Sequence, residues 1–456
     1  MRASQAADIQ GTPGAGSAGR DAAATLAALR RGELAGVREL HLPGLGLREF
    51  PREVFGLATS LEVLDVSGNA LTDLPEDIGR LGRLGVLFAS GNPMPRLPVG
   101  LGGCAALGQL GFRGCGMRDV PGEALPPQLR WLTLTDNRIE TLPAALGERP
   151  ALQKLMLAGN RLRHLPHSLA GAARLELLRL SANAFDTLPP WLASLPRLAW
   201  LAWAGNPLDP AVTDQTSAIP WAELQPGRWL GEGASGEVRE VLWTAPGTAR
   251  PLAAALKLFK GRMTSDGLPE REMAACLRAG PHPQLTGALG RVAGHPEGRD
   301  GLLMPLLPAQ WRVLAGPPSL QSCSRDVYPP AMRLAPAVAL RIAHDAAAAA
   351  AHLHARGVLH GDLYGHNLLW DGTTGAAVLS DFGAASFLPD GAAGEALRRL
   401  ETRAWGLLLG ELVACSGLDD VALRRLEQDC VQPAVAARPT MAEALAALAA
   451  HPLLRH

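Results

Sequence analysis

The sequence lacks a net charge, because 43 basic side chains balance 43 acidic ones among its 456 residues. Electrostatic binding to nucleic acid or to an anionic membrane needs a basic face, so we expect neither kind of partner. Long apolar runs are also missing, and the longest break off well before the ~18 residues of a membrane-spanning helix. The hydrophobic content of 47% nevertheless excludes general disorder. The length predicts two or more domains.

Paired cysteines are absent too, since the six cysteines lie far apart and no two form a CxxC pair. They are Cys104, Cys115, Cys276, Cys323, Cys415 and Cys430. Scattered thiols indicate neither a disulfide framework nor a zinc site. Residues 1–20 are polar and small, without the apolar core of a signal peptide. We therefore expect a cytoplasmic protein with a disordered tail over residues 1–20, although this Gly-, Ser- and Ala-rich tail leaves a secretion signal open.

Lysine is scarce, with Lys154, Lys257 and Lys260 as the only examples, while the other 40 basic residues are arginines. Together with 51 glycines and 37 prolines, this usage indicates a GC-rich coding genome and a bacterial source. Because lysine is so rare, a lysine within an apolar segment of this chain is a candidate functional residue.

A repeat of 22 or 23 residues fills the first half of the chain. Each unit has an LxxLxL stretch followed by an asparagine, or once a cysteine, and many units continue with Leu-Pro. The asparagine slot is occupied by Asn69, Asn92, Cys115, Asn137, Asn160, Asn183 and Asn206. With a weaker first unit near Val37, the pattern predicts eight repeats.

These units resemble leucine-rich repeats, which implies an α/β solenoid, or horseshoe, over residues 21–210. The alternating leucines of each short strand would point inward and stack on those of the next unit. The asparagine after the strand can satisfy backbone groups of the turn. Residues 21–36 predict an amphipathic helix over the first repeat, and residues 208–210 close the other end.

A protein partner, either substrate or regulator, is expected on the concave strand face, because exposed aromatic side chains among small residues suit protein binding. The slot between the strand leucines contains His41, Asp65, Phe88, Gly111, Thr133, Met156, Arg179 and Ala202. A neighbouring column contains Val63, Trp131, Lys154 and Trp200. The alternative is that these side chains merely cover an ordinary surface.

After a linker over residues 211–225, a second domain is predicted over residues 226–456. It opens with a glycine-rich segment in which strand-forming residues follow the last glycine, so a hairpin over a nucleotide is favoured over a strand-to-helix turn. Bare glycines let the backbone approach phosphate oxygens closely. The residues placed at the nucleotide are Gly231, Glu232, Gly233, Ala234, Ser235, Gly236 and Val238.

Lys257 lies in the apolar segment 252–259, where a buried ammonium needs an anionic partner. A compact ammonium also suits phosphate neutralisation better than the fork of an arginine. The following helical segment offers Glu272, preferred over Glu270, to orient that lysine. The segment 301–307 predicts a buried strand that leads to an adenine site, with Met304 and Leu307 beside the base.

The stretch His360-Gly-Asp362-Leu-Tyr-Gly-His-Asn367, followed by Asp381-Phe-Gly383, completes the pattern. Asp362 can accept the proton of an attacking hydroxyl, while Asn367 and Asp381 offer oxygen ligands to Mg²⁺. Residues 220–450 resemble the eukaryotic-type protein kinase fold, and the whole chain resembles bacterial leucine-rich-repeat protein kinases.

The resemblance implies an α+β bilobal kinase domain that uses ATP and Mg²⁺, with Ser or Thr of a protein as the acceptor. Asp362 would be the catalytic base, Lys257 and Asn367 would assist it, and Asn367 and Asp381 would hold the metal. Arg438 would belong to a structural C-terminal element of the family.

Several residues depart from the family pattern. The usual arginine before the catalytic aspartate is Gly361, so phosphorylation of an activation loop is not the expected switch. Tyr364 replaces the lysine of serine/threonine kinases, and His366 stands where tyrosine kinases have an arginine. Glu401 follows Asp381 by only 20 positions, so the activation segment is short, and the expected fold is a kinase domain with a reduced C-lobe. A small-molecule phosphotransferase of the aminoglycoside-kinase kind and an inactive scaffold therefore stay open as alternatives.

Overall fold

The computed structural model describes residues 18–209, 218–233, 235–248, 250–261, 263–264 and 266–455. These residues form two compact units. The repeat unit extends to Leu195 and includes Asn206–Leu208, whereas the second unit contains Pro196–Gly205 and the chain from Asp209 onward. Most of the predicted tail, residues 1–17, lies outside the described residues.

The repeats form a parallel sheet of eight strands in the order β1 to β8. The strands are β1 Glu39–His41, β2 Val63–Asp65, β3 Val86–Phe88, β4 Gln109–Gly111, β5 Trp131–Thr133, β6 Lys154–Met156, β7 Leu177–Arg179 and β8 Trp200–Ala202. The central leucines, such as Leu64, Leu87 and Leu155, are fully buried. The prediction of eight stacked leucine-rich units is confirmed.

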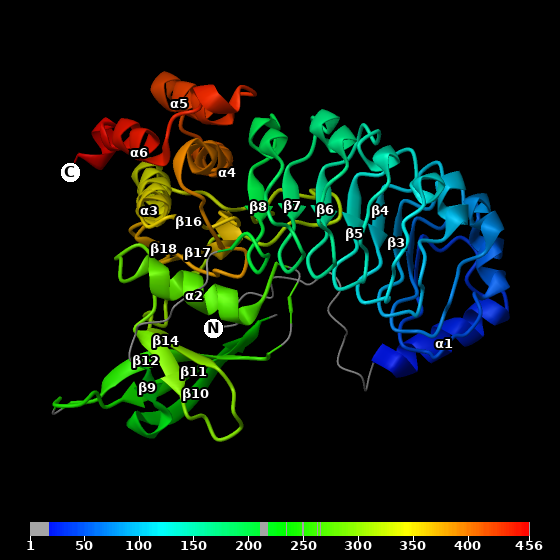
Figure 1. Ribbon diagram of the computed structural model, residues 1–456, viewed down its shortest axis with the longest axis horizontal. Coiled ribbons are helices and arrows are strands. Elements are labelled where there is room, and N and C mark those ends of the chain that lie inside the picture. Colours follow the sequence, from blue (N-terminus) through cyan, green and yellow to red (C-terminus); the bar gives the residue numbers. More distant parts are fainter. Residues whose placement is uncertain are drawn as a thin grey trace. The chain divides into compact units, whose positions relative to one another are not determined.

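The return path of each repeat is a short 3₁₀ turn, and a proline stands at its N-cap because the fixed φ of proline suits the start of a turn. Figure 1 shows these turns on the side of the repeat unit away from the strands. The turns are η1 Arg52–Leu57, η2 Glu76–Arg80, η3 Val99–Gly103, η4 Gly122–Ala124, η5 Ala144–Leu146, η6 His167–Gly171 and η7 Pro190–Ser194.

The helix before the first repeat, α1, spans Ala18–Arg30 and buries Ala22 and Leu29. The prediction of a helix over residues 21–36 is therefore wrong at its C-terminal end. Gly32 and Gly36 have φ values of 73° and 82°, a left-handed conformation that ends an α-helix.

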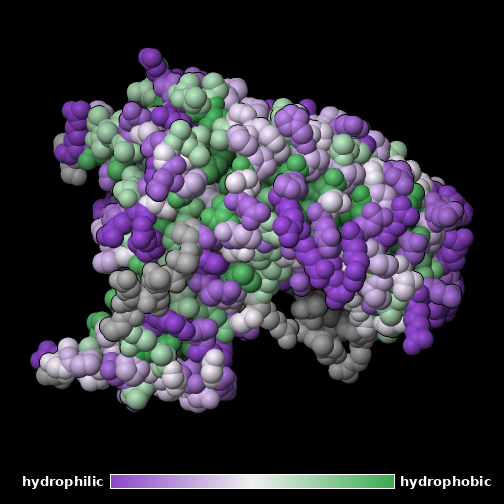
Figure 2. Space-filling model, viewed as in Figure 1, coloured by the Kyte–Doolittle hydropathy of each residue, from purple (hydrophilic) through white to green (hydrophobic). Residues whose placement is uncertain are grey.

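The surface of the repeat unit is mostly hydrophilic on the face that Figure 2 shows, with smaller apolar areas between polar side chains. Charged side chains of neighbouring repeats form exposed pairs, as Arg52 does with Asp77 at 2.8 Å and Arg96 with Asp119 at 2.9 Å. Exposed pairs of this kind contribute little stability, so the buried leucines hold the repeats together.

The second unit begins with a six-stranded sheet in the order β10-β11-β12-β14-β13-β9. Its strands are β9 Ile219–Pro220, β10 Leu224–Glu232, β11 Gly236–Trp243, β12 Leu252–Phe259, β13 Gly290–Ala293 and β14 Gly301–Pro305. Helix α2, Pro269–Ala279, lies between this sheet and the helical part of the unit (Figure 1). The sheet core contains Val241, Leu256 and Leu303.

The helical part is built on α3 Pro336–Ala355, α4 Gly391–Ser416, α5 Val421–Val431 and α6 Met441–Ala449. Short strands lie beside them: β15 Arg312–Val313, β16 Val358–Leu359, β17 Leu368–Trp370, β18 Ala377–Leu379 and β19 Ser386–Phe387. Four single turns complete the described part of the unit: η8 Trp221–Glu223, η9 Gly365–Asn367, η10 Val435–Ala437 and η11 Pro452–Leu454. The loops between these strands carry the catalytic candidates.

The boundary between the halves differs from the predicted linker over residues 211–225. Residues 210–217 lie outside the described residues, but β9 already pairs with β13 through Ile219 and Val292. Pro196–Gly205, predicted to be part of the repeats, groups with the second unit. Sequence periodicity could not reveal this, because the segment keeps the repeat pattern, whereas its hydrogen bonds with Leu363 and Ser386 join residues 163 and 183 positions apart.

Candidate active site

The glycine-rich segment is the turn of the antiparallel hairpin β10–β11, in which Glu232 lies opposite Glu237. A Cβ atom at Gly236 would stand 2.5 Å from the carbonyl oxygen of Leu258, whereas one at Gly233 would meet none of the described residues within 4 Å. Gly236 is thus needed for the approach of β12, and Gly233 borders open space. Ala234, predicted to belong to the nucleotide site, lies outside the described residues.

Lys260 ties this turn to β12. Its ammonium group lies 2.8 Å from Oε1 of Glu232 and donates a hydrogen bond to the carbonyl of Gly233 at 2.9 Å. The amide of Lys260 also donates to the carbonyl oxygen of Ser235 at 3.0 Å. The turn is therefore held from both sides of its tip.

Lys257 lies on β12 opposite Val238 of β11 and opposite Leu302 of β14. Its ammonium group pairs with Oε1 of Glu272 on α2, and both side chains are largely buried. Burial by itself would lower the pKa of Lys257, but the carboxylates of Glu272 and Asp381 outweigh it and raise that pKa. The pairing therefore favours the charged form of Lys257 within the unit.

The predicted adenine-site residues lie at the end of β14 and just beyond it. Met304 pairs with Ala255 across the sheet, and both Met304 and Leu307 are half-buried. Glu270, the less favoured partner for the lysine, lines a pocket described below.

The segment after β16 brings Asp362 and Asn367 together. The side-chain amide of Asn367 donates to the backbone carbonyl and to Oδ2 of Asp362, both at 2.8 Å. The hydrogen bond from Nδ2 of Asn367 holds the carboxylate of Asp362 in one orientation. The carbonyl of Asn367 in turn accepts hydrogen bonds from the amide and hydroxyl of Ser380 at 2.9 Å and 2.8 Å.

Asp381 follows β18 and has a left-handed backbone with φ of 63°. Such strained positions cluster at functional sites. Its Oδ1 accepts a hydrogen bond from the amide of Gly383 at 3.1 Å, and the residue is exposed.

The side-chain oxygens of Asn367 and Asp381 fit Mg²⁺, which takes one or two protein carboxylate or amide oxygens and completes its shell with water and phosphate. In Asn367 the Nδ2 faces Asp362, so its Oδ1 is the atom that could meet a cation. Among the described residues, no group of three or more His, Cys, Asp and Glu side chains could hold a metal by itself.

Glu401 of α4 anchors the segment that carries Asp362. Its carboxylate accepts hydrogen bonds from the amide of Gly361 at 2.7 Å and of His360 at 3.4 Å, and it pairs with His354 at 2.8 Å. Burial alone would raise the pKa of Glu401, but His354 and these donors outweigh it and lower that pKa. The carboxylate is therefore the charged form.

His366 is held by Asp326, a residue that sequence reasoning missed. Nδ1 of His366 lies 2.7 Å from Oδ1 of Asp326, and Nε2 lies 3.9 Å from Oδ2 of Asp362. Burial would lower the pKa of His366, but Asp326, Asp362 and Asp381 outweigh it and raise that pKa. No sequence signal marked Asp326, because it belongs to an irregular stretch between β15 and α3.

Comparison with known families fits this geometry. The family model described as protein tyrosine and serine/threonine kinase matches residues 224–396, and two leucine-rich-repeat models match residues 60–81 and 127–185. Leucine-rich repeats and a protein kinase domain are fused in this chain. The second unit is the kinase unit from here on.

Among solved structures, a leucine-rich-repeat protein of Leptospira interrogans is 27% identical, with a TM-score of 0.35. The match covers 40% of this chain and 51% of that one, so it spans about half of the relative's length. No match is found among curated proteins.

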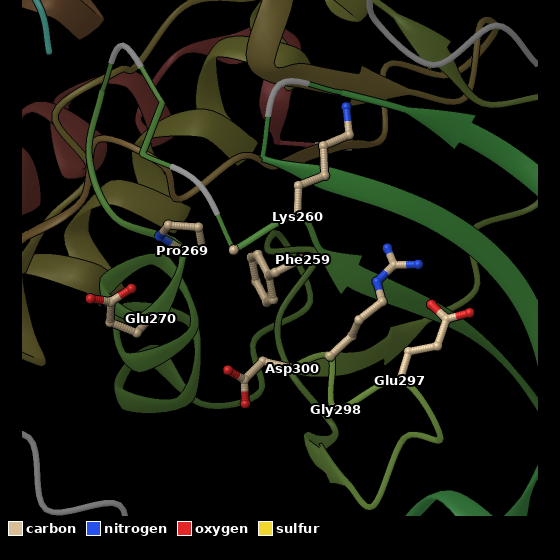
Figure 3. A pocket seen from close by; sticks show the side chains of 9 residues that line it. Phe259, Lys260, Pro269, Glu270, Glu297, Gly298 and Asp300 are labelled. Atoms are coloured by element: carbon tan, nitrogen blue, oxygen red, sulfur yellow. The ribbon is translucent and has the colours of Figure 1, made fainter.

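A pocket of about 580 Å³ lies in the kinase unit, between the end of β12, the start of α2 and the β13–β14 loop (Figure 3). Its lining residues are Phe259, Lys260, Gly261, Pro269, Glu270, Glu297, Gly298, Arg299 and Asp300. None of the predicted catalytic residues lines it, and its charges are of both signs.

In the described part of the chain, no helix is long and apolar enough to cross a membrane.

The aromatic side chains predicted to be exposed on the repeat strands are buried instead. Trp131 is 6% exposed: it donates a hydrogen bond to Thr133, and the ammonium of Lys154 lies 4.0 Å from its ring centroid. Trp200 is 2% exposed and stacks on Tyr364. The prediction was wrong because strand alternation gives the direction of a side chain but not what covers it.

Proposed function

We propose that this chain is an ATP-dependent protein kinase whose acceptor is a Ser or Thr hydroxyl of a protein. The observation that carries the proposal is the buried Lys257–Glu272 pair, whose lysine is also influenced by the charge of Asp381. A buried cation beside an exposed carboxylate and an open glycine turn matches what a bound triphosphate requires.

Each residue of the site has its own role in the proposed reaction. Lys257 neutralises phosphate charge and is held in place by Glu272, and Gly233 leaves room for the phosphates beside the turn. Asp362 accepts the proton of the attacking hydroxyl while Asn367 fixes its orientation. Mg²⁺, held by oxygens of Asn367 and Asp381, would supply charge neutralisation on the phosphates when bound.

The departures from the family pattern define the kind of kinase. With Gly361 in place of an arginine, the chain lacks the side chain that receives a phosphorylated activation loop in the family, so activity should not depend on such phosphorylation. The segment between Asp381 and α4 at Gly391 is short, which favours substrate selection by the repeats.

The repeats are proposed to recruit the protein substrate or a regulator. In the slot predicted for a partner, the side chain of His41 on β1 is 55% exposed and Asp65 on β2 is half-buried. A His41→Glu/Asp65→Arg variant should phosphorylate a short generic peptide as wild type does, but label fewer protein substrates. Equal labelling of proteins would remove this slot from recognition.

The test of the activity is phosphate transfer from labelled ATP with Mg²⁺, comparing wild type with Asp362→Ala. The protein itself, generic protein acceptors and an aminoglycoside panel are offered in parallel. Labelling of protein that the variant loses is expected. Labelling of small molecules alone would assign the chain to the small-molecule phosphotransferases, and bound nucleotide without any transfer would assign it to the scaffolds.

A further inference from the structure

The segment Pro196–Gly205 follows the repeat pattern, yet within the kinase unit it lies directly against the loop that carries Asp362. The indole N–H of Trp200 donates a hydrogen bond to the backbone carbonyl of Leu363 at 3.1 Å. Its ring stacks on Tyr364 with a centroid distance of 4.2 Å and an interplanar angle of 6°. Trp200 thus contacts both residues that follow the proposed catalytic base.

The same segment restricts which residue can stand at position 361, on the other side of Asp362. Gly361 has a φ of 74°, and a Cβ atom there would stand 2.7 Å from the carbonyl oxygens of Leu201 and Ala384. Any side chain would collide with the backbone of β8. The close approach of Leu201 therefore accounts for the glycine where the family has an arginine.

Tyr364, the replacement for the family lysine, is explained by the same contact. Its ring is the stacking partner of Trp200, and its hydroxyl donates to the carbonyl of Ser324 at 3.1 Å. Arg325 adds a cation 5.9 Å from the ring centroid of Trp200. A lysine at position 364 would lose the stacked face and bring a second cation close to Arg325.

The segment is also fixed to the kinase unit at points away from the loop. The amide of Trp203 donates to Oγ of Ser386 at 2.9 Å. Arg438 donates to the carbonyl of Pro196 at 2.7 Å, and Arg403 to that of Arg197 at 3.1 Å. These hydrogen bonds hold the segment, and with it Trp200, against the kinase unit.

We propose that Trp200 is a positioning residue of the kinase, so that the last repeat segment is part of the catalytic apparatus. The inference rests on the proposed kinase function. Trp200 holds Leu363 and Tyr364 from one side while Glu401 holds Gly361 and His360 from the other, and Asp362 lies between the two anchors. A base displaced by ~1 Å loses up to about a hundredfold in rate, so the loss of one anchor lowers turnover.

The experiment compares full-length wild type, Trp200→Phe and Trp405→Phe. Phenylalanine at position 200 keeps an aromatic face for Tyr364 but removes the N–H donated to Leu363. Trp405 of α4 is equally buried and donates its N–H to the carbonyl of Ala343 at 2.9 Å, so its substitution is a matched loss away from the loop. A Tyr364→Leu variant removes the stacking from the other side and covers the case in which Trp200→Phe fails to fold.

Turnover number, KM for ATP and nucleotide affinity are measured below the unfolding temperature of every variant. Trp200→Phe and Tyr364→Leu should lower kcat about tenfold with unchanged ATP binding, while Trp405→Phe keeps wild-type kcat. Full kcat in Trp200→Phe, or equal losses in Trp200→Phe and Trp405→Phe, would overturn the positioning role. A wild-type chain that transfers no phosphate to any acceptor would instead overturn the kinase function, and this inference with it.

Discussion

The repeat unit and the kinase unit bury polar side chains in different ways. In the repeat unit they are mainly neutral amides used in the same way several times: Asn92 and Asn160 each donate to a carbonyl of their own repeat and to one of the preceding repeat at 2.9–3.0 Å. In the kinase unit they are mainly charged groups used once, such as Lys257 with Glu272 and His354 with Glu401.

Buried polar groups therefore serve stability in the repeat unit, whereas in the kinase unit they include the candidates for catalysis. A buried neutral amide that makes all its hydrogen bonds costs little and can be repeated, so every repeat contributes a similar share of stability. A buried charge is costly and tolerated only beside a specific partner. The kinase unit therefore concentrates its sensitivity on a few residues, which are also the candidates for catalysis.

The strongest test of this contrast is Lys257→Met. It leaves the carboxylate of Glu272 buried without its partner, so we expect a loss of about 3–5 kcal/mol in unfolding free energy and a loss of kcat of at least about a hundredfold. Denaturant unfolding and the transfer assay measure the two effects.

The double variant Lys257→Met/Glu272→Met serves as its control. It should regain most of the stability, because no uncompensated charge stays buried, but none of the activity. A double variant that regains activity would contradict the role of Lys257 at the phosphates.

A second test asks where the kinase unit begins. A chain of residues 196–456 retains Trp200 and Trp203, which are 2% and 0% exposed, whereas residues 218–456 lose both. Since truncating one buried tryptophan costs ~3–5 kcal/mol, the shorter chain should be less stable by at least ~3 kcal/mol. Equal thermal midpoints would place Pro196–Gly205 outside the folding unit.

A third, smaller effect is expected for Asn137→Ala in the repeat unit. The side chain donates to the carbonyls of Phe112 and Leu134 and accepts from the amides of Cys115 and Met117. Leaving these groups unsatisfied should cost about 2 kcal/mol in the unfolding of the repeats. The exposed Arg138→Ala is the control, and phosphate transfer to a generic peptide should stay at the wild-type level in both.

The smallest effect is the pH dependence of Asp371 between β17 and β18. Burial by itself would raise its pKa, but hydrogen bonds from the hydroxyl of Thr374 and from the amides of Thr373, Thr374 and Gly375 lower it to about 2. Because the folded pKa lies below the ordinary value of 3.8, this contribution is full above pH ~4 and is lost as the pH falls to ~2.

Asp371→Ala should therefore lower the unfolding free energy at pH 7 by less than ~1 kcal/mol, after allowance for solvent screening. The difference from wild type should shrink between pH 4 and pH 2 in urea titrations. A difference that stays constant with pH would show that the charge of Asp371 contributes nothing.

Much of this protein was accessible from the sequence. The 23-residue period predicted eight stacked strands and the role of the asparagines, because a repeat places the same residue in the same environment each time. Spacing also predicted the hairpin at Gly231–Gly236 and the helix with Glu272, since both depend on residues close in the chain.

The tertiary structure alone decided which distant residues meet. The sequence could not show that Asp326 holds His366, or that Trp200 covers Tyr364 instead of facing a partner. Local patterns fix strands, turns and the direction of side chains, because these follow from neighbouring backbone geometry. Contacts between residues 40 or 160 positions apart follow from packing, which gave Gly361 and Tyr364 a reason that the motif by itself could not supply.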